Sequence, residues 1–153
     1  MKAYISWSGD LSRKVATTLQ HWLTKNIYPI QILDIETDIQ IGQSWKMKID
    51  EVFQSTELVI FCVTRNSLNS HWFTYELGYF TSKSNTKAII PLLVDVEPSE
   101  VHGPIAYYQF YGIDNNSIHK LVSKIKDISR SKTGLPHYSG HRRKLIRQHY
   151  YFV

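Results

Sequence analysis

Leu58-Val59-Ile60-Phe61-Cys62-Val63 is the segment that most strongly indicates the type of fold. Six apolar residues follow one another without a polar interruption, which is typical of a strand covered on both faces in a parallel sheet. Residues 64–69 are mostly polar and predict the loop that leaves this strand. Residues 70–80 then have the apolar spacing of a helix. A strand, a loop and a helix in this order form the repeating unit of an α/β domain.

The rest of the chain continues this alternation on both sides of the central strand. Further strands are predicted at residues 3–7, 30–33, 88–94 and 107–111, and further helices from residue 11, from residue 45 and over 117–128. Pro91 favours a position away from full pairing. We therefore expect an α/β fold, a flavodoxin-like three-layer sandwich with a five-stranded parallel sheet in the order 2-1-3-4-5. Ligands of such sheets bind beyond the carboxyl ends of the strands, where the order reverses between strands 1 and 3.

The helix over residues 70–80 has two different faces, and it starts close to that expected site. Three apolar side chains at helical spacing predict a core stripe: Phe73, Leu77 and Phe80. Trp72, Glu76 and Tyr79 share another face, with Tyr75 beside them. A carboxylate among aromatic rings can hold ribose hydroxyls or meet a developing positive charge, while a ring can stack on a cationic base. Taken alone, the short Trp-x-x-x-Glu pattern favours an ordinary surface Glu beside a half-buried Trp, by roughly ten to one.

Length and composition limit the class of protein. The 153 residues, 42% of them hydrophobic, predict one domain whose core needs no disulfide or metal. The single cysteine, Cys62, lies in the apolar run and is expected to be a buried thiol. Met1-Lys2 leads into a strand without a signal-peptide core, and no apolar run approaches the roughly 20 residues that span a membrane. We therefore expect a cytoplasmic protein that does not contact membranes.

The net charge of +5 belongs to the last part of the sequence. Residues 1–128 hold 12 Lys or Arg and 13 Asp or Glu, whereas residues 129–153 hold six basic residues and no acidic one. We therefore expect a domain over 1–129 and a basic extension over 130–153. Docking of this extension on the domain or on a neighbouring copy is favoured over nucleic-acid binding, because its aromatic residues come only at the end. Its three histidines lack the spacing of a zinc site.

Three stretches of the chain carry a family resemblance: Lys2-Ala3-Tyr4-Ile5-Ser6-Trp7-Ser8-Gly9-Asp10, Ile41-Gly42-Gln43-Ser44-Trp45 and Ser70-His71-Trp72-Phe73-Thr74-Tyr75-Glu76-Leu77-Gly78. Together they resemble a Toll/interleukin-1 receptor (TIR) domain, in particular the bacterial NAD-consuming type. The resemblance covers residues 2 to about 129. It implies cleavage of NAD at the nicotinamide–ribose bond, with nicotinamide and ADP-ribose or a cyclic ADP-ribose isomer as products, in bacterial antiviral defence.

The resemblance also implies the roles of individual residues. Glu76 matches the catalytic glutamate of the family, and Trp72 matches its helix tryptophan. The other residues expected to bind substrate come from the same helix and from the loops after strands 1 and 2: Tyr75, Ser6, Trp7, Ser8, Gly9, Asp10 and Trp45. NAD is then the substrate, and no cofactor or metal is expected. The chain lacks the basic cluster that the animal enzymes have after strand 1. Arg13 and Lys14 are therefore either candidates for holding the pyrophosphate or simply solvated helix residues.

The chemistry of these side chains agrees with that implied activity. Positive charge develops on the ribose as nicotinamide leaves, and Glu76 could stabilise it as a glycosidase carboxylate does. No second carboxylate is evident to activate water, and Asp10 and Asp38 are offered only as speculative candidates.

Self-association is the partner interaction that we expect. The loop from Asp34 to Gln43 carries three apolar side chains that a solvated loop does not need, namely Ile35, Ile39 and Ile41. The resemblance implies that this loop gates the pocket and contacts a neighbouring copy, giving an oligomer or filament. Two alternatives stay open: a TIR module that signals by assembly without catalysis, and an enzyme similar to nucleoside deoxyribosyltransferases.

Overall fold

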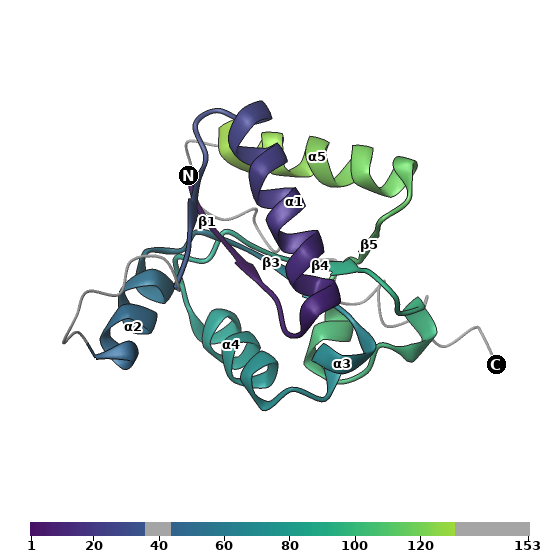
Figure 1. Ribbon diagram of the computed structural model, residues 1–153. Coiled ribbons are helices and arrows are strands. Elements are labelled where there is room, and N and C mark those ends of the chain that lie inside the picture. Colours follow the sequence, from purple (N-terminus) through teal and green to yellow (C-terminus); the bar gives the residue numbers. More distant parts are fainter. Residues whose placement is uncertain (36–43, 131–153) are drawn as a thin grey trace.

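A parallel five-stranded sheet with the strand order β2-β1-β3-β4-β5 forms the centre of the protein (Figure 1). The computed structural model describes residues 1–35 and 44–130. The strands are β1 (Lys2–Ser6), β2 (Gln31–Leu33), β3 (Leu58–Val63), β4 (Ala88–Leu93) and β5 (Tyr111–Gly112). The predicted fold and strand order are therefore confirmed.

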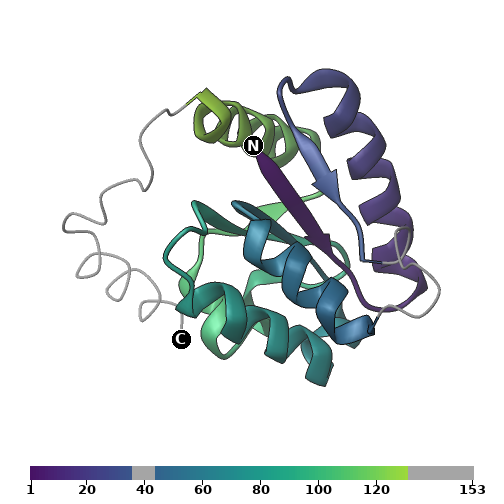
Figure 2. The same ribbon diagram turned by 90° about the vertical axis from the view of Figure 1, so that its left-hand side faces the viewer.

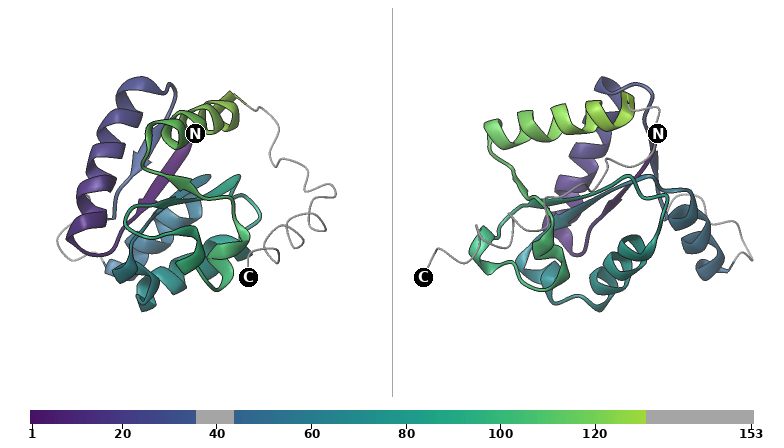
Figure 3. Two further views of the ribbon diagram at one scale, coloured as in Figure 1. Left: turned by 90° about the vertical axis from the view of Figure 1, so that its right-hand side faces the viewer. Right: turned by 180° about the vertical axis from the view of Figure 1, so that it is seen from behind.

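Helices cover both faces of this sheet. They are α1 (Asp10–Asn26), α2 (Trp45–Ser55), α3 (Arg65–Leu68), α4 (His71–Ser82) and α5 (Asn115–Arg130), with short 3-10 turns at Pro98–Glu100 and Pro104–Tyr107. One layer consists of α1 and α5, and the other contains α2, α3 and α4 (Figures 2 and 3). Across the part of the chain that the structure describes, no helix is long and apolar enough to cross a membrane.

The central strand β3 separates two hydrophobic cores. It pairs with β1 on one side and β4 on the other, and all six of its side chains are buried. Because side chains alternate along a strand, Ile60 and Cys62 pack in the core under α1 and α5, while Phe61 and Val63 pack under α2 and α4. Cys62 is a buried thiol, as expected. The uninterrupted apolar sequence of β3 thus reflects burial from both sides.

The structure corrects four details of the sequence-based prediction. Residues 64–69 are not an irregular loop, because Thr64 and Ser67 form a capping box that starts the short helix α3. The fifth strand is Tyr111–Gly112 and not residues 107–111, because Tyr107 ends a 3-10 turn and residues 108–110 form no regular element. Pro91 lies inside β4 and is paired with Phe61, just before the part of β4 that also pairs with β5.

Ile35 is the fourth correction. It was expected to contact a neighbouring copy, but it is only 5% exposed and belongs to the same core as Phe53. Ile39 and Ile41, the other two apolar residues of the predicted contact loop, lie outside the described residues, as does the predicted basic extension beyond Arg130.

Candidate functional site

The candidate site lies where α4 crosses β1. Tyr4 and Ser6 are two residues apart in β1, so both side chains point to the face covered by α2 and α4. Ala3 and Ile5 point to the opposite face and pack in the other core. Ser6 is the last residue of β1 and therefore lies at the carboxyl edge of the sheet. This edge, between β1 and β3, is where the fold is expected to bind ligands.

Glu76 of α4 is fully buried at this crossing, with 0% of its surface exposed. The Tyr4 hydroxyl donates a hydrogen bond to Glu76 Oε1 at 2.6 Å, and the Ser6 hydroxyl donates to Glu76 Oε2. A buried carboxylate is costly unless hydrogen bonds compensate for the lost water, and β1 supplies two such donors. The sequence-based expectation that Glu76 lies on a face outside the core is therefore wrong.

Burial is the largest cause of the pKa shifts of Glu76 and Tyr4. It raises the pKa of Glu76 from 4.5 to about 7, while hydrogen bonds from the side chains of Ser6, Tyr4 and Trp72 act in the opposite direction. The pKa of Tyr4 lies well above its ordinary value because of burial, the charge of Glu76, the hydrogen bond to it and the charge of Asp34. Near neutral pH, Glu76 is thus close to its titration midpoint and Tyr4 remains a proton donor. A carboxylate in this state can act as an acid, a base or a charge stabiliser.

Aromatic rings extend from Glu76 toward the surface between α2 and α4. The ring centroids of Trp72 and Tyr75 are 5.3 Å apart. Both rings also pack on Phe53 of α2, with centroid distances of 6.2 Å and 6.3 Å. Trp72 is half-buried, whereas Tyr75 is 48% exposed. Trp72 therefore has a structural role, and Tyr75 offers accessible aromatic surface.

Residues 7–10, which follow β1, were expected to bind substrate beside Glu76, but the structure arranges them differently. Trp7 packs against the core under α1, on the other side of the sheet from Glu76, and the Arg13 guanidinium lies 5.1 Å from its ring centroid. Gly9 has a φ of 89° and precedes α1, a backbone conformation that favours glycine. Asp10 is the first residue of α1 and, like Gly9, is exposed.

A hydroxyl within α1 holds this loop in place. The Ser8 amide donates to Ser12 Oγ at 2.9 Å, so Ser12 binds the loop, and neither Ser12 nor Asp10 caps the helix. Trp45 is the first residue of α2 and is 48% exposed. Among the described residues, the structure thus brings together Ser6, Trp72, Tyr75 and Glu76, whereas the hydrogen bonds and ring contacts of this group do not include Trp45 or residues 7–10.

Tyr4 is the residue of this group that the sequence-based prediction missed. The signal was present, since Tyr4 and Ser6 follow the period of two that places hydroxyls on one face of a strand. What the sequence did not reveal was that this face meets α4.

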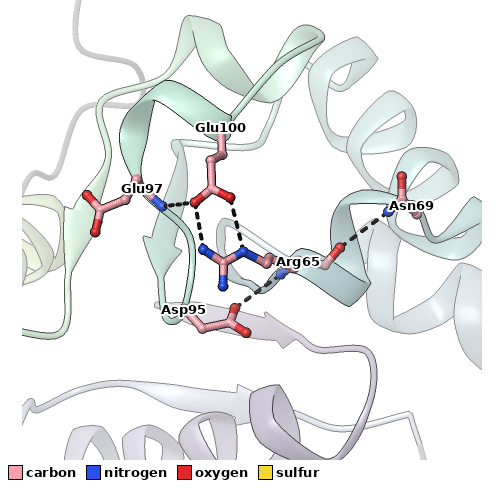
Figure 4. Close-up of polar contacts among 5 residues, drawn as sticks. All are labelled: Arg65, Asn69, Asp95, Glu97 and Glu100. Atoms are coloured by element: carbon pink, nitrogen blue, oxygen red, sulfur yellow. Dashed lines mark hydrogen bonds and ion pairs between the residues drawn. The ribbon is translucent and has the colours of Figure 1, made fainter.

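A second polar group lies at the carboxyl edge of β3 and β4 (Figure 4). The Arg65 guanidinium donates to both carboxylate oxygens of Glu100 at 3.0 Å, and the Arg65 backbone N–H donates to Asp95 Oδ1 at 3.1 Å. Hydrogen bonding to Glu100 raises the pKa of Arg65, which is solvent-exposed. Because carboxylates surround the Arg65 guanidinium, we infer that it stabilises the contact between α3 and the segment after β4 and does not bind phosphate.

Two further features do not belong to the candidate site. A groove of about 570 Å³ at the amino-terminal edge of the sheet is lined by Met1, Tyr28, Gln31, Glu57 and Asn85 among others, and includes none of the predicted site residues. Within residues 1–35 and 44–130, no group of three His, Cys, Asp or Glu side chains is placed to hold a metal ion.

Comparison with known proteins identifies the family and the fold. The sequence matches the family described as "TIR domain" over residues 4–122. Among solved structures it is similar to the TIR domains in the "Structure of the activated Roq1 resistosome directly recognizing the pathogen effector XopQ", with a TM-score of 0.56 and 16% identity over 96% of this chain and 95% of that chain. At this identity the likeness shows the fold alone. No curated protein sequence matches the chain.

Proposed function

Because this chain belongs to the TIR domain family, we propose that it cleaves NAD at the nicotinamide–ribose bond, with Glu76 as its catalytic carboxylate. The products would be nicotinamide and either ADP-ribose or a cyclic ADP-ribose isomer. NAD is the substrate in this proposal, and no cofactor or metal takes part.

The observation that carries the proposal is the hydrogen-bonded carboxylate at the crossing of β1 and α4. A fully buried Glu is rare in proteins unless it is paired, and its burial here is not needed to fill a core. Leu or Met would occupy the same volume without the cost of desolvation. A titratable group held in such a place, at the edge where this fold binds ligands, favours a role in chemistry.

The residues around Glu76 suit the proposed reaction. Nicotinamide leaves as a neutral molecule, so positive charge develops on the ribose and is best met by a fixed carboxylate in a low-dielectric site. The accessible surface of Tyr75, next to Trp72, could stack on the cationic nicotinamide ring. Since Glu76 is closed off from solvent in the free protein, α4 or the loop after β1 would move when substrate enters.

Self-association and an immune role form the second part of the proposal. The solved TIR domains that this chain resembles in fold come from an activated resistosome that recognises a pathogen effector. On α2, Trp45 and Met47 are 48% and 64% exposed, which leaves apolar surface for contact with a second copy. We propose an assembly whose activity depends on contacts between copies, acting in the cytoplasm in antiviral defence.

The same exposed surface supports one alternative, a TIR module that signals by assembly and does not cleave NAD. Product analysis separates the two. The purified protein is incubated at high concentration with NAD, and nicotinamide, ADP-ribose and cyclic isomers are separated by chromatography. The enzyme proposal expects nicotinamide and one ribose-containing product in equal amounts. Intact NAD beside protein that light scattering shows to be assembled would favour the alternative.

A further inference from the structure

The hydrogen bond between Tyr4 and Glu76 points to a role for a residue to which the family resemblance assigned none. We propose that Tyr4 is a positioning residue that holds the Glu76 carboxylate for NAD cleavage. This inference rests on the proposed function, and it concerns a hydroxyl group that packing alone would not require.

The geometry of the bond is that of a strong, fixed contact. Tyr4 Oη lies 2.6 Å from Glu76 Oε1, the short distance typical of a hydroxyl that donates to a charged carboxylate. The Tyr4 side chain cannot turn away, because its ring centroid lies 5.4 Å from that of Phe53 and 6.0 Å from that of Phe80. Tyr4 is only 7% exposed. The hydroxyl is thus held at one point in the core and aimed at one oxygen.

Packing explains the ring of Tyr4 but not its hydroxyl. Phenylalanine would make the same ring contacts with Phe53 and Phe80 and would bring no polar atom into the core. The Tyr4 hydroxyl and the Glu76 carboxylate therefore account for each other's presence in the core. Without the other, each would be a buried polar group with fewer hydrogen-bond partners.

Tyr4 and Ser6 hold different oxygens at different depths. Ser6 ends β1 at the carboxyl edge of the sheet, next to the half-buried Trp7 and Ser8. Tyr4 lies two residues further inside, about 7 Å along the strand. Oε1 is therefore anchored inside the core, while Oε2 is held on the side where a ligand of this fold would arrive. When substrate displaces the Ser6 contact, the Tyr4 contact still fixes the direction of the carboxylate.

The same bond controls the pH at which Glu76 becomes charged. Hydrogen bonds from Ser6, Tyr4 and Trp72 stabilise the charged form against the effect of burial. Among the charged side chains of the elements packed on this face, Asp34 after β2 and Lys48 and Asp50 of α2 are at least partly buried, whereas Lys46 and Glu51 of α2 and Arg65 of α3 are exposed. Of these groups, Asp34 raises the pKa of Tyr4. Removing the Tyr4 hydroxyl therefore raises the pKa of Glu76 further and leaves less of the carboxylate charged at neutral pH.

Tyr4→Phe tests the inference, and Tyr111→Phe is its matched control. Tyr111 is also 7% exposed but lies in the core on the other face of the sheet. In Tyr4→Phe, kcat at pH 7 should fall about tenfold or more with little change in KM for NAD, and the acid limb of the pH profile should move up by about one unit. Titration of the Glu76 carboxyl carbon, followed by ¹³C NMR, should show the same upward shift. Tyr111→Phe should leave all three measurements unchanged.

The possible failures are distinguishable. Absence of nicotinamide release by the wild-type protein would overturn the proposed function, and with it the positioning role of Tyr4 in NAD cleavage. An unchanged carboxyl titration and pH profile in folded Tyr4→Phe would overturn the inference alone. If Tyr4→Phe does not fold, the Tyr4 hydroxyl proton of the wild-type protein is followed by NMR instead. Its resonance should move as Glu76 titrates, and a resonance that ignores this titration would contradict the inference.

Discussion

At the scale of the residue, Glu76 is the side chain on which both the proposed function and a pH dependence of stability rest. Its burial and its hydrogen bonds to Tyr4 and Ser6 place a titratable group inside an aromatic core. Such a group couples folding to pH, because the folded and unfolded chains bind protons with different affinity. The consequence can be measured without any knowledge of the substrate.

We predict that the wild-type protein loses stability as pH rises from about 5 to 8. Burial raises the pKa of Glu76 from 4.5 to about 7, so in this window the folded protein holds a proton that the unfolded chain has released. This stabilisation is complete below the pKa of Glu76 in the unfolded chain and is lost as the pH rises through its pKa in the folded protein. The free energy of unfolding changes by roughly 3 kcal/mol. Thermal unfolding of wild type and Glu76→Gln over this range measures it. The melting temperature of Glu76→Gln should fall less, and two parallel curves would show that Glu76 titrates normally.

Trp72 packs in the aromatic cluster and has a binding role only in the proposed function, and substitution can separate the two. Trp72→Phe keeps the ring contacts with Phe53 and Tyr75, so the melting temperature should change little while NAD turnover falls in part. Trp72→Ala removes the contacts and should destabilise the protein by up to about 3 kcal/mol, the lower end for an aromatic residue because Trp72 is only half-buried. Normal turnover by folded Trp72→Ala would remove Trp72 from the binding site.

At the scale of the element, α4 owes its position to α2. Phe53 of α2 is 0% exposed and contacts Tyr4 of β1 and the α4 rings of Trp72, Tyr79 and Phe80. This one side chain therefore sets the distance between the two helices and the strand that together hold Glu76. The site is precise only as long as this packing is intact.

We expect Phe53→Ala to destabilise the domain by about 3–5 kcal/mol, because it leaves a cavity among rings that cannot all move into it. Leu11→Ala is a suitable control, since Leu11 is 47% exposed on α1 and away from this cluster. Chemical denaturation of both variants measures the difference. Equal stability of the two variants would mean that the aromatic cluster is not what holds α4 in place.

The sequence predicted the elements better than their contacts. The apolar run Leu58–Val63 and the helical spacing of the α4 core residues identified the central strand and its helix, because burial imposes a regular pattern on sequence. The strand order was predicted from the alternation of five strands with helices along the chain. The burial of Glu76 was not predicted, because the spacing of residues along a helix shows which residues share a face but not which side chains pack against that face. Here Tyr4 and Ser6, some 70 residues earlier, turn a polar position into a core position.

At the scale of the whole molecule, the exposed side of α2 is the surface through which we propose that two copies make contact. The domain is complete as a sandwich of two cores, yet α2 leaves Met47 64% exposed. The sequence-based expectation of contacts through Ile39 and Ile41 remains a prediction, because these residues lie outside the described part of the chain.

We predict that specific activity rises with protein concentration and that Met47→Asp suppresses this rise without unfolding the domain. A charge at this exposed position would oppose burial against a second copy. Tyr28→Asp is the matched control, since Tyr28 is 95% exposed beside the groove at the amino-terminal edge of the sheet. Nicotinamide release and light scattering are measured over the same dilution series. Flat specific activity with a monomer throughout would rule out activation by assembly.

We propose above that the buried Glu76 carboxylate catalyses NAD cleavage. The most direct test of this proposal is the rate of nicotinamide release by wild-type protein and by Glu76→Gln at the same high concentration, with circular dichroism to verify that both are folded. Loss of one preorganised electrostatic group predicts a fall of about a hundredfold or more for Glu76→Gln. Equal release by the two folded proteins, or NAD that stays intact with both, would contradict the account.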